Sequence, residues 1–90
     1  MSGRGTGMQI EVRYFASLRE ALGTGEGVEL PEGSTVAGAR DALIARGGVH
    51  AEALARGRAL RSALNQALCE ESAALADGAE LAFFPPVTGG

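Results

Sequence analysis

The part of this 90-residue sequence that could do chemistry is its C-terminal segment, FFPPVTGG, residues 83–90. Pro85 and Pro86 favour the stiff, extended polyproline conformation, which projects the residues after them away from the rest of the protein. Gly89 and Gly90 lack a Cβ atom, so they can pass through a channel too narrow for other residues. The carboxylate of Gly90 is then the reactive group at the tip, and ATP can activate such a carboxylate as an acyl-adenylate. The segment therefore indicates a tail that reacts in the active site of another protein.

A frayed tail that ends in two glycines by chance is a weak alternative. The chain has 14 glycines among 90 residues, so two in a row at the end have a probability of roughly 2%. Val87 and Thr88 also suit an extended conformation, because both are small and β-branched. A stiff apolar segment directly before the glycines weakens the chance explanation further.

The rest of the sequence contains no complete catalytic set. His50 has no Ser, Cys or Asp partner at a recognisable spacing, and we expect it on the surface. We expect Cys69 to be a small buried or half-buried residue, with a reactive thiol as the alternative. The pair Glu70-Glu71 indicates a solvated turn, with contact to the arginines of a partner as the alternative. The chain is therefore not a catalyst alone, and we expect it to hold no metal ion and no permanent cofactor.

Composition narrows the function further. A mass of 9.1 kDa indicates one domain, and a net charge of −3 does not suit a nucleic-acid partner. The single cysteine permits no intrachain disulfide, so a cytoplasmic setting is the simplest expectation. We expect no membrane association, because no apolar run approaches the length of a membrane span and no signal-peptide pattern opens the chain. All eight basic residues are arginine, so no side-chain amine is available for an isopeptide bond.

Hydrophobic alternation predicts the first and last strands. Residues 8–15, MQIEVRYF, place Ile10, Val12 and Tyr14 on one face. Residues 79–84, AELAFF, place Leu81 and Phe83 on one face. The two prolines that follow must end the strand, because proline has no backbone donor. Between these strands, residues 16–23 favour two helical turns, and residues 25–33 favour a short strand that Pro31 and Gly33 end.

The strongest helix signals lie in residues 34–48, STVAGARDALIARGG. We expect Ser34 or Thr35 to cap the N-terminus and Gly47-Gly48 to end the helix, with Arg46 in its last turn. Gly38 either costs about 1 kcal/mol relative to alanine or permits close packing on the sheet. The apolar stripe of this helix consists of Val36, Ala39, Leu43 and Ile44.

Two stretches remain ambiguous. Residues 49–56 form a short helix or a loop. In residues 60–75, Leu60, Leu64 and Leu68 fit a helix and also fit one face of a strand, and periodicity alone does not decide. Strands mixed with one main helix predict an α+β domain over residues 8–84, between a flexible leader (residues 1–7) and an extended tail (residues 85–90).

Four segments carry a resemblance to a known family. AFFPPVTGG, with LNQAL and LADGAEL before it and VRYFASLREALG near the start, resembles the small subunits of molybdopterin synthase, which belong to the ubiquitin-like sulfur carriers. The resemblance runs from Met8 to Gly90 and is poor around residues 46–58. It implies a β-grasp fold, in which a mixed sheet packs on one main helix, and a strand for LRSALNQAL (residues 60–68).

The resemblance also implies a mechanism. A ubiquitin-activating-like adenylyltransferase uses ATP to adenylate Gly90, and a sulfur donor protein converts the terminus to a thiocarboxylate. The tail then enters the large subunit of the synthase, where the sulfur passes to cyclic pyranopterin monophosphate and forms the dithiolene that holds molybdenum. Gly89 lets the tail thread and residues 84–88 position it. The family suggests a heterotetramer of two small and two large subunits.

The strand pattern adds a docking surface to this expectation. In a β-grasp sheet the first and last strands are central neighbours, so Phe15, Ala82 and Phe84 share the face opposite the core. An exposed aromatic pair at the root of the tail is a natural docking patch for a partner, with Glu11 and Arg13 as a polar rim. The alternative is that surrounding loops cover these residues.

Three other functions stay open at this point. A sulfur carrier could serve thiazole, cysteine or tRNA thiolation pathways instead. A protein modifier would become conjugated to lysines of other proteins. A plain interaction domain would use the tail as a docking peptide and would not need Gly90.

Overall fold

The computed structural model describes residues 7–86. In chain order, this part of the protein contains β1 (Gly7–Tyr14), α1 (Ser17–Leu22), β2 (Gly25–Pro31), α2 (Val36–Ile44), α3 (Gly48–Ala53), β3 (Arg61–Leu64), β4 (Ala67–Cys69) and β5 (Glu80–Phe84). Strand β1 begins one residue before the predicted start at Met8, and the other residues of the predicted leader lie outside the described residues. The ambiguous residues 49–56 contain most of a short helix, α3.

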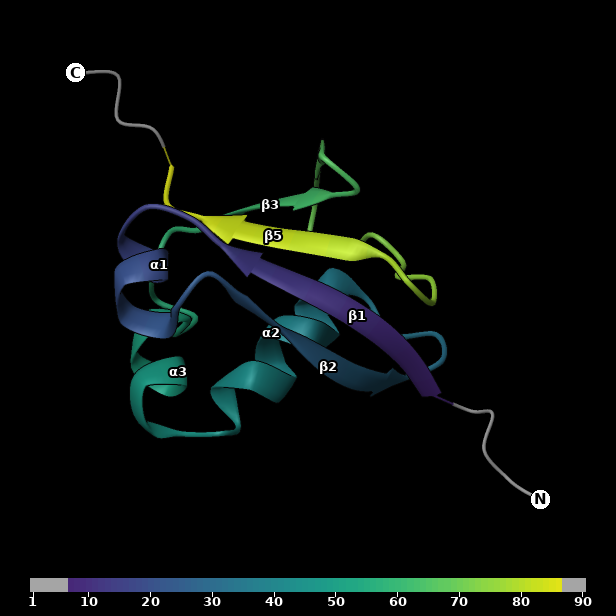
Figure 1. Ribbon diagram of the computed structural model, residues 1–90, viewed down its shortest axis with the longest axis horizontal. Coiled ribbons are helices and arrows are strands. Elements are labelled where there is room, and N and C mark those ends of the chain that lie inside the picture. Colours follow the sequence, from purple (N-terminus) through teal and green to yellow (C-terminus); the bar gives the residue numbers. More distant parts are fainter. Residues whose placement is uncertain (1–6, 87–90) are drawn as a thin grey trace.

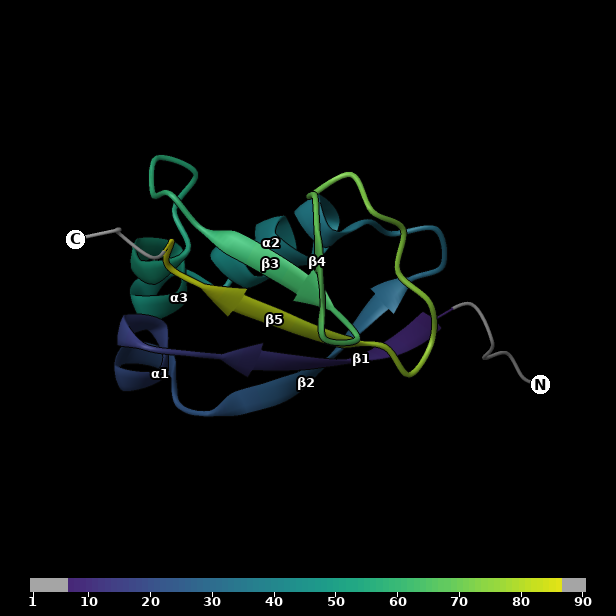
Figure 2. The same cartoon turned by 90° about the horizontal axis from the view of Figure 1, so that it is seen from above.

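The strands form a single mixed sheet in the order β2-β1-β5-β3-β4. The central strands β1 and β5 are parallel, whereas β1–β2, β3–β5 and β3–β4 are antiparallel pairs. The helices cover one face of the sheet, and α1 lies at the end where β1 and β5 finish (Figures 1 and 2). The tail leaves from this same end. This arrangement confirms the predicted α+β class and the central pairing of the first and last strands, and it is the β-grasp architecture of ubiquitin-like proteins.

The core lies between the sheet and the helices. Strand β1 alternates exposed and buried residues along its whole length, as predicted. Burying each large apolar side chain contributes about 1.5–3 kcal/mol, so this face carries much of the stability. The side chains that are at most 1% exposed come from both layers: Ile10, Val12, Tyr14, Val36, Ala39, Leu43, Leu54, Leu81 and Phe83.

Helix α2 begins as the sequence predicts and ends slightly earlier. The Thr35 hydroxyl accepts a hydrogen bond from the Gly38 backbone N–H at 3.2 Å and so caps the first turn. The helix ends at Ile44, so Arg46 lies beyond it rather than in its last turn. Gly47 adopts a φ of 76°, a left-handed conformation that other residues reach only with strain.

Gly38 is not in close contact with the sheet. A Cβ atom built on it would have Thr35 Oγ1 as its nearest neighbour at 3.7 Å, which is an ordinary van der Waals distance. The suggestion that this glycine permits close packing is therefore wrong, and its cost in helix propensity remains.

The ambiguous stretch forms a β-hairpin, so the strand that the resemblance implied for residues 60–68 is two short strands. Asn65 and Gln66 lie between β3 and β4 with φ angles of 50° and 72°, as a tight two-residue hairpin turn requires. Leu64 is half-buried against the core, but Leu68 lies beyond the turn and is 66% exposed. Because the turn reverses the chain, the equal spacing of these leucines does not place them in one environment.

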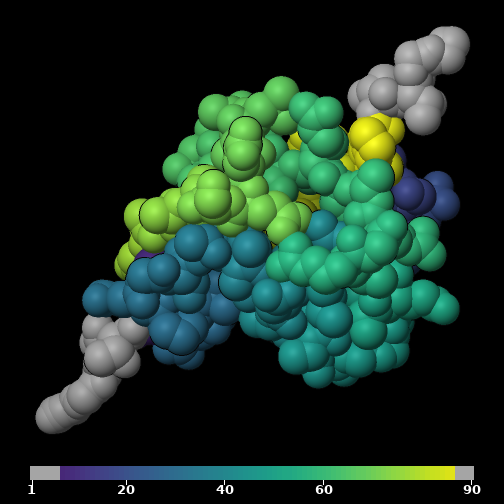
Figure 3. All heavy atoms as spheres, turned by 180° about the vertical axis from the view of Figure 1, so that it is seen from behind, coloured from purple at the N-terminus to yellow at the C-terminus, as the bar shows by residue number. Residues whose placement is uncertain are grey.

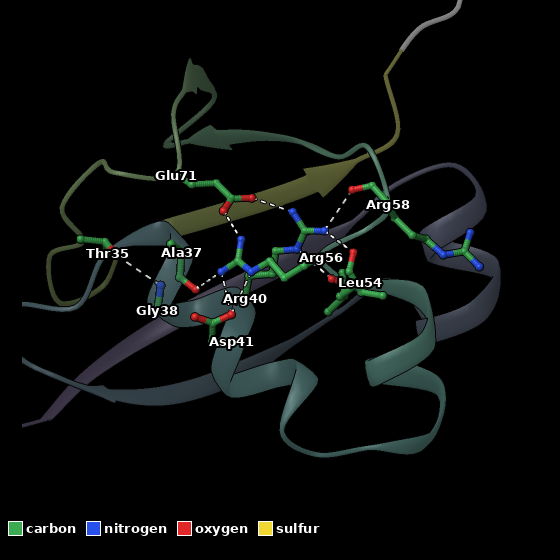
Figure 4. A network of polar contacts seen from close by, with 10 residues as sticks. Thr35, Ala37, Gly38, Arg40, Asp41, Leu54, Arg56, Arg58 and Glu71 are labelled. Atoms are coloured by element: carbon green, nitrogen blue, oxygen red, sulfur yellow. Dashed lines mark hydrogen bonds and ion pairs between the residues drawn. The ribbon is translucent and has the colours of Figure 1, made fainter.

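A buried arginine organises the stretch after α3 (Figure 4). The guanidinium of Arg40 on α2 forms an ion pair with Glu71 at 2.7 Å. Arg40 is only 3% exposed. It also donates hydrogen bonds to three backbone carbonyl oxygens of the loop before β3, those of Leu54, Ala55 and Arg58. These bonds satisfy a charge that would otherwise be costly to bury. Arg40 therefore ties the loop and the segment before β5 to the main helix.

The prediction of a solvated turn at Glu70-Glu71 is wrong for Glu71. Its carboxylate is half-buried and binds both Arg40 and Arg56. Burial alone raises the pKa of Glu71, but the hydrogen bonds from Arg56 and Arg40 outweigh burial and lower it. Both arginines belong to this chain and not to a partner. The spacing of these residues in the sequence did not predict the two ion pairs.

Candidate functional site at the root of the tail

Strand β5 leads directly into the tail. The strand ends at Phe84, and Pro85 and Pro86 follow without strand pairing, as the missing backbone donors of proline require. Figure 1 shows this root at the end of the sheet beside α1. The four remaining residues with predicted tail roles lie outside the described residues: Val87, Thr88, Gly89 and Gly90.

The three predicted docking residues come together on the face of the sheet that the helices leave uncovered, which we call the open face. Phe15, Ala82 and Phe84 line one hollow of about 410 Å³ together with three further residues, Ala63, Gln66 and Glu80. Phe15 is 45% exposed. Phe84 is half-buried, so the alternative expectation that loops cover both aromatics is wrong for Phe15, whereas Phe84 is partly covered. The prediction that these residues lie together on this face is confirmed, but Ala82 and Phe84 are half-buried, and the docking role of all three stays a prediction.

The rim of the hollow is polar. Arg13 lies 3.6 Å from the carboxylate of Glu80 on the neighbouring strand. The side chain of Arg13 is 49% exposed and that of Glu80 is 33% exposed, so solvent weakens this ion pair and it contributes little to stability. Glu11 is also exposed, opposite Glu80 in the register of β1 and β5. Neither Glu11 nor Arg13 lines the hollow itself, and Arg13 reaches its rim through Glu80, a residue that the sequence reasoning missed.

Leu68 extends the apolar surface of the open face. It pairs with Ala63, and Ala63 pairs with Ala82, so the three residues point to the same side of the sheet. With 66% of its surface exposed, Leu68 is the most exposed large apolar residue among residues 7–86. The sequence could reveal this placement only once the turn at residues 65–66 is known, because the turn sets the pairing register.

A second polar cluster holds α3 against the sheet. The carboxylate of Glu26 accepts hydrogen bonds from the hydroxyl of Tyr14 at 2.6 Å and from Arg46 at 2.5 Å, and contacts His50 Nε2 at 2.8 Å. Burial raises the pKa of Glu26, but the hydrogen bonds from Tyr14, His50 and Arg46 outweigh it and lower the pKa to about 2. Burial and the bond to Glu26 raise the pKa of Tyr14. His50 is therefore a half-buried structural residue, and the expectation that it lies on the surface is wrong.

The remaining candidates do not form a further reactive site in residues 7–86. Cys69 is half-buried, as predicted, and burial raises the pKa of its thiol, which disfavours the reactive thiolate. Within the described residues no group of three or more His, Cys, Asp or Glu side chains is placed to bind a metal ion. Across the same range, no helix has the length and apolar character needed to cross a membrane.

The fold and the tail root define a ubiquitin-like domain whose last central strand leads into a Gly-Gly terminus, and comparison with known proteins agrees. The ThiS family profile matches residues 12–90. The chain is 42% identical to the molybdopterin synthase sulfur carrier subunit of Escherichia coli, over 90% of this chain and 99% of that protein. The chain therefore belongs to the ThiS family.

Two solved structures resemble the fold closely. The small archaeal modifier protein 1 of Haloferax volcanii superposes with a TM-score of 0.73 at 30% identity, over 89% of this chain and 99% of that one. A complex of subunits 1 and 2 of the molybdopterin-converting factor from Helicobacter pylori contains a chain with a TM-score of 0.60 at 27% identity, over 92% of this chain and 100% of that one. The likeness covers the whole β-grasp domain in both.

Proposed function

We propose that this chain is the sulfur carrier subunit of molybdopterin synthase in molybdenum cofactor biosynthesis. The observation that carries the proposal is 42% identity to a sulfur carrier subunit of that enzyme over 99% of the relative's length. The family match runs to residue 90 and so includes the Gly-Gly terminus. The geometry supports the proposal, because the tail root borders an exposed apolar hollow that suits a partner surface.

The reaction takes place at the carboxylate of Gly90. An adenylyltransferase joins it to the AMP part of ATP and releases pyrophosphate. A sulfide equivalent from the sulfur donor protein then displaces AMP and leaves a thiocarboxylate. In the large subunit this sulfur passes to cyclic pyranopterin monophosphate, and water restores the carboxylate. ATP is thus a substrate of the activating enzyme, and the carrier needs no cofactor of its own.

The open face and the tail have different roles in this function. Phe15, Ala82 and Phe84 dock the large subunit, while Pro85 and Pro86 direct the tail into its active site. Gly89 permits passage through a narrow channel. The structure of the Helicobacter pylori complex of subunits 1 and 2 supports a paired assembly of this kind. The carrier docks on the large subunit and extends its tail into the active site, and the large subunit provides the catalytic residues.

Two alternatives share the same activated terminus. The likeness to the small archaeal modifier protein 1 supports a protein modifier, which would form isopeptide bonds with lysines of other proteins. A carrier for thiazole, cysteine or tRNA thiolation would deliver the same sulfur to another acceptor. Identity to a molybdopterin synthase subunit over nearly its full length favours the first function.

The test is the intact mass of the chain after incubation with ATP, the activating enzyme and a sulfur donor. We expect a gain equal to the exchange of one oxygen for sulfur, located at Gly90 by fragmentation. Addition of the large subunit and cyclic pyranopterin monophosphate should return the original mass. No gain, with enzymes that are active on a known carrier, would refute sulfur carriage. A persistent thiocarboxylate in the presence of the large subunit would refute the molybdopterin acceptor.

A chain that lacks Gly89 and Gly90 is the matched control. It should keep the thermal midpoint of the full chain and gain no sulfur, because the fold does not depend on these residues and the chemistry does. Full activity in this truncated chain would refute sulfur carriage at Gly90 and would mean that the tail serves only as a docking peptide.

A further inference from the structure

The open face carries a positive charge at the end where the tail leaves. Arg61, the first residue of β3, lies opposite Phe84 in the register of β3 and β5. The next pair, Ser62 and Phe83, is buried on the helix side, so Arg61 and Phe84 point to the open face. Arg61 is exposed. Its guanidinium therefore stands on the open face beside the tail root.

The other end of the open face is acidic. Glu11 and Glu80 lie opposite each other in the register of β1 and β5. Glu29 on the edge strand β2 lies opposite the exposed Gln9 and adds a further carboxylate to this end. The ion pair with Arg13 at 3.6 Å compensates part of the charge of Glu80. The open face is therefore polarised along the direction of its central strands.

The two ends are far enough apart to act separately on a partner. Four residues of β5 separate Glu80 from Phe84, which corresponds to about 13 Å at about 3.3 Å per residue. This separation exceeds the Debye length of about 8 Å at physiological ionic strength. Within residues 7–86 neither Glu11 nor Arg61 has an ion-pair partner. Both charges are thus available to a protein that covers the open face.

Arginines of the helical layer are used differently. Figure 3 shows that side of the protein, where residues of α2 and α3, in blue and teal, cover the central strands. Arg40, Arg46 and Arg56 all form ion pairs with carboxylates of this chain, and so stabilise the packing of the layer. Arg61 has no such partner in the part of the chain that the structure describes, so a carboxylate of another protein can bind it.

We propose that Arg61 is a specificity-determining residue for the large subunit and pairs with a carboxylate at the entrance of the channel that receives the tail. The proposal rests on the function proposed above, in which Phe15 and Phe84 dock that subunit. Four residues follow Pro86, and an extended chain spans at most about 3.6 Å per residue, or about 14 Å. The channel entrance must therefore lie against the tail root, where Arg61 stands.

The polarity of the open face also sets the orientation of the complex. In the productive orientation the partner's carboxylate meets Arg61. In the reversed orientation it meets the carboxylates of Glu11 and Glu80, and like charges at an interface are strongly unfavourable. The field of the open face therefore aligns the tail with the channel during the approach of the two proteins. Arg61 governs association and leaves the chemical step of sulfur transfer unchanged.

The experiment measures the association and dissociation rate constants of the full chain and the large subunit. Arg61→Glu should lower the association rate constant about tenfold at low ionic strength, with the dissociation rate constant within about twofold, as is typical of a charge at the rim of an interface. The effect should largely disappear in about 1 M salt, where the Debye length is about 3 Å. Arg61→Lys keeps the charge and should stay within about threefold of wild type.

A double variant separates polarity from net charge. Arg61→Glu combined with Glu11→Arg keeps the wild-type net charge of −3 and reverses the polarity. We expect it to associate at least as slowly as Arg61→Glu, because the field then favours the reversed orientation. A return to the wild-type association rate would show that net charge alone matters, and would overturn the proposal.

Arg61→Gln and Ala42→Glu form a matched pair, because each lowers the net charge by one unit. Ala42 is exposed on α2, away from the open face. Arg61→Gln should slow association about threefold, and Ala42→Glu should not slow it. Circular dichroism and the thermal midpoint verify folding, which we expect because Glu11, Ala42 and Arg61 are exposed.

The remaining outcomes separate this proposal from the proposed function. Wild-type association of Arg61→Glu would overturn the role of Arg61 and leave sulfur carriage intact. A loss that is equal at low and high salt would indicate a role in packing and would also overturn it. A wild-type chain that gains no sulfur and does not bind the large subunit would overturn the proposed function and the role of Arg61 together.

Discussion

The two faces of the central strands β1 and β5 have opposite properties, although alternate residues of the same two strands form them. On the helix side Val12, Tyr14 and Phe83 are at most 1% exposed, whereas Phe15 on the open face is 45% exposed. Phe83 and Phe84 are neighbours in sequence, and the strand period of two turns one into the core and the other toward the hollow. One face therefore provides stability, and the other leaves apolar surface for a partner. Substitutions on the two faces should separate these contributions.

Phe83→Ala should have the largest effect on stability. The side chain is completely buried between the sheet and the helices. Removing a buried phenylalanine costs about 3–5 kcal/mol, from lost burial and from the cavity that remains. Denaturant unfolding at low temperature, with wild type as reference, measures the loss. A cost below about 1 kcal/mol would mean that the helix side is not the stabilising face.

Arg40→Met should come second. The side chain is buried and joins α2 to the loop before β3 and to Glu71. Methionine keeps an apolar stem but leaves Glu71 and several backbone oxygens without their donor, so we expect a loss of about 3 kcal/mol. Unfolding free energy measures this loss, and faster hydrogen exchange in residues 54–58 would localise it. Arg56→Met is a suitable comparison, because Arg56 is exposed and should matter much less.

Phe84→Ala should weaken partner binding instead of the fold. Phe84 lines the open-face hollow with Phe15. Affinity for the large subunit should fall about thirtyfold, or about 2 kcal/mol, as expected for an aromatic hot spot. Calorimetric titration with the large subunit measures this change. If Phe84→Ala lost as much stability as Phe83→Ala and kept its affinity, the division between the two faces would be refuted.

Glu26→Gln should make stability less dependent on pH. The folded pKa of about 2 lies below the ordinary value of 4.5, so the charged carboxylate stabilises the fold above about pH 5, and this contribution is lost as the pH falls toward 2. We expect the variant to be about 2 kcal/mol less stable than wild type at pH 7, with a difference that shrinks between pH 5 and pH 2. Unfolding curves of both proteins across this pH range test whether the stability difference shrinks as the pH falls. A difference that is constant with pH would show that the charge of Glu26 is not the cause.

Gly38→Ala should produce the smallest change, and in the favourable direction. The new methyl group finds only ordinary van der Waals contacts, and the residue lies in the first turn of α2. Alanine should raise the unfolding free energy by up to about 1 kcal/mol through higher helix propensity and a less flexible unfolded chain. The thermal midpoint measures the gain. Sulfur transfer should not change, since Gly38 is remote in sequence and environment from the tail root.

Local patterns predicted most of the elements that position the candidate site. Alternation around Ile10 and Leu81 located β1 and β5, and the cap at Thr35 located α2. The same alternation placed Phe15, Ala82 and Phe84 together once the two strands were known to be neighbours. These signals are reliable because burial follows directly from the strand and helix periods.

The interactions that the sequence did not reveal are all long-range. Arg40 meets Glu71 across 31 positions and Glu26 meets His50 across 24. No local period relates such residues, so His50 and Glu71 were both expected to be exposed to solvent. The leucines of the β3–β4 hairpin were ambiguous for a related reason, because the turn at Asn65 and Gln66 decides which of them face the core.

By itself, the sequence determined the first and last strands and the main helix, and it predicted a stiff tail that ends in two glycines. Residue type and spacing decide those features through backbone geometry. Only the tertiary structure decided which polar residues are buried and that a hollow opens beside the tail root. The physical reason is that a hollow exists between elements, and the pairing of β1, β5 and β3 around it is settled by contacts between residues far apart in the chain.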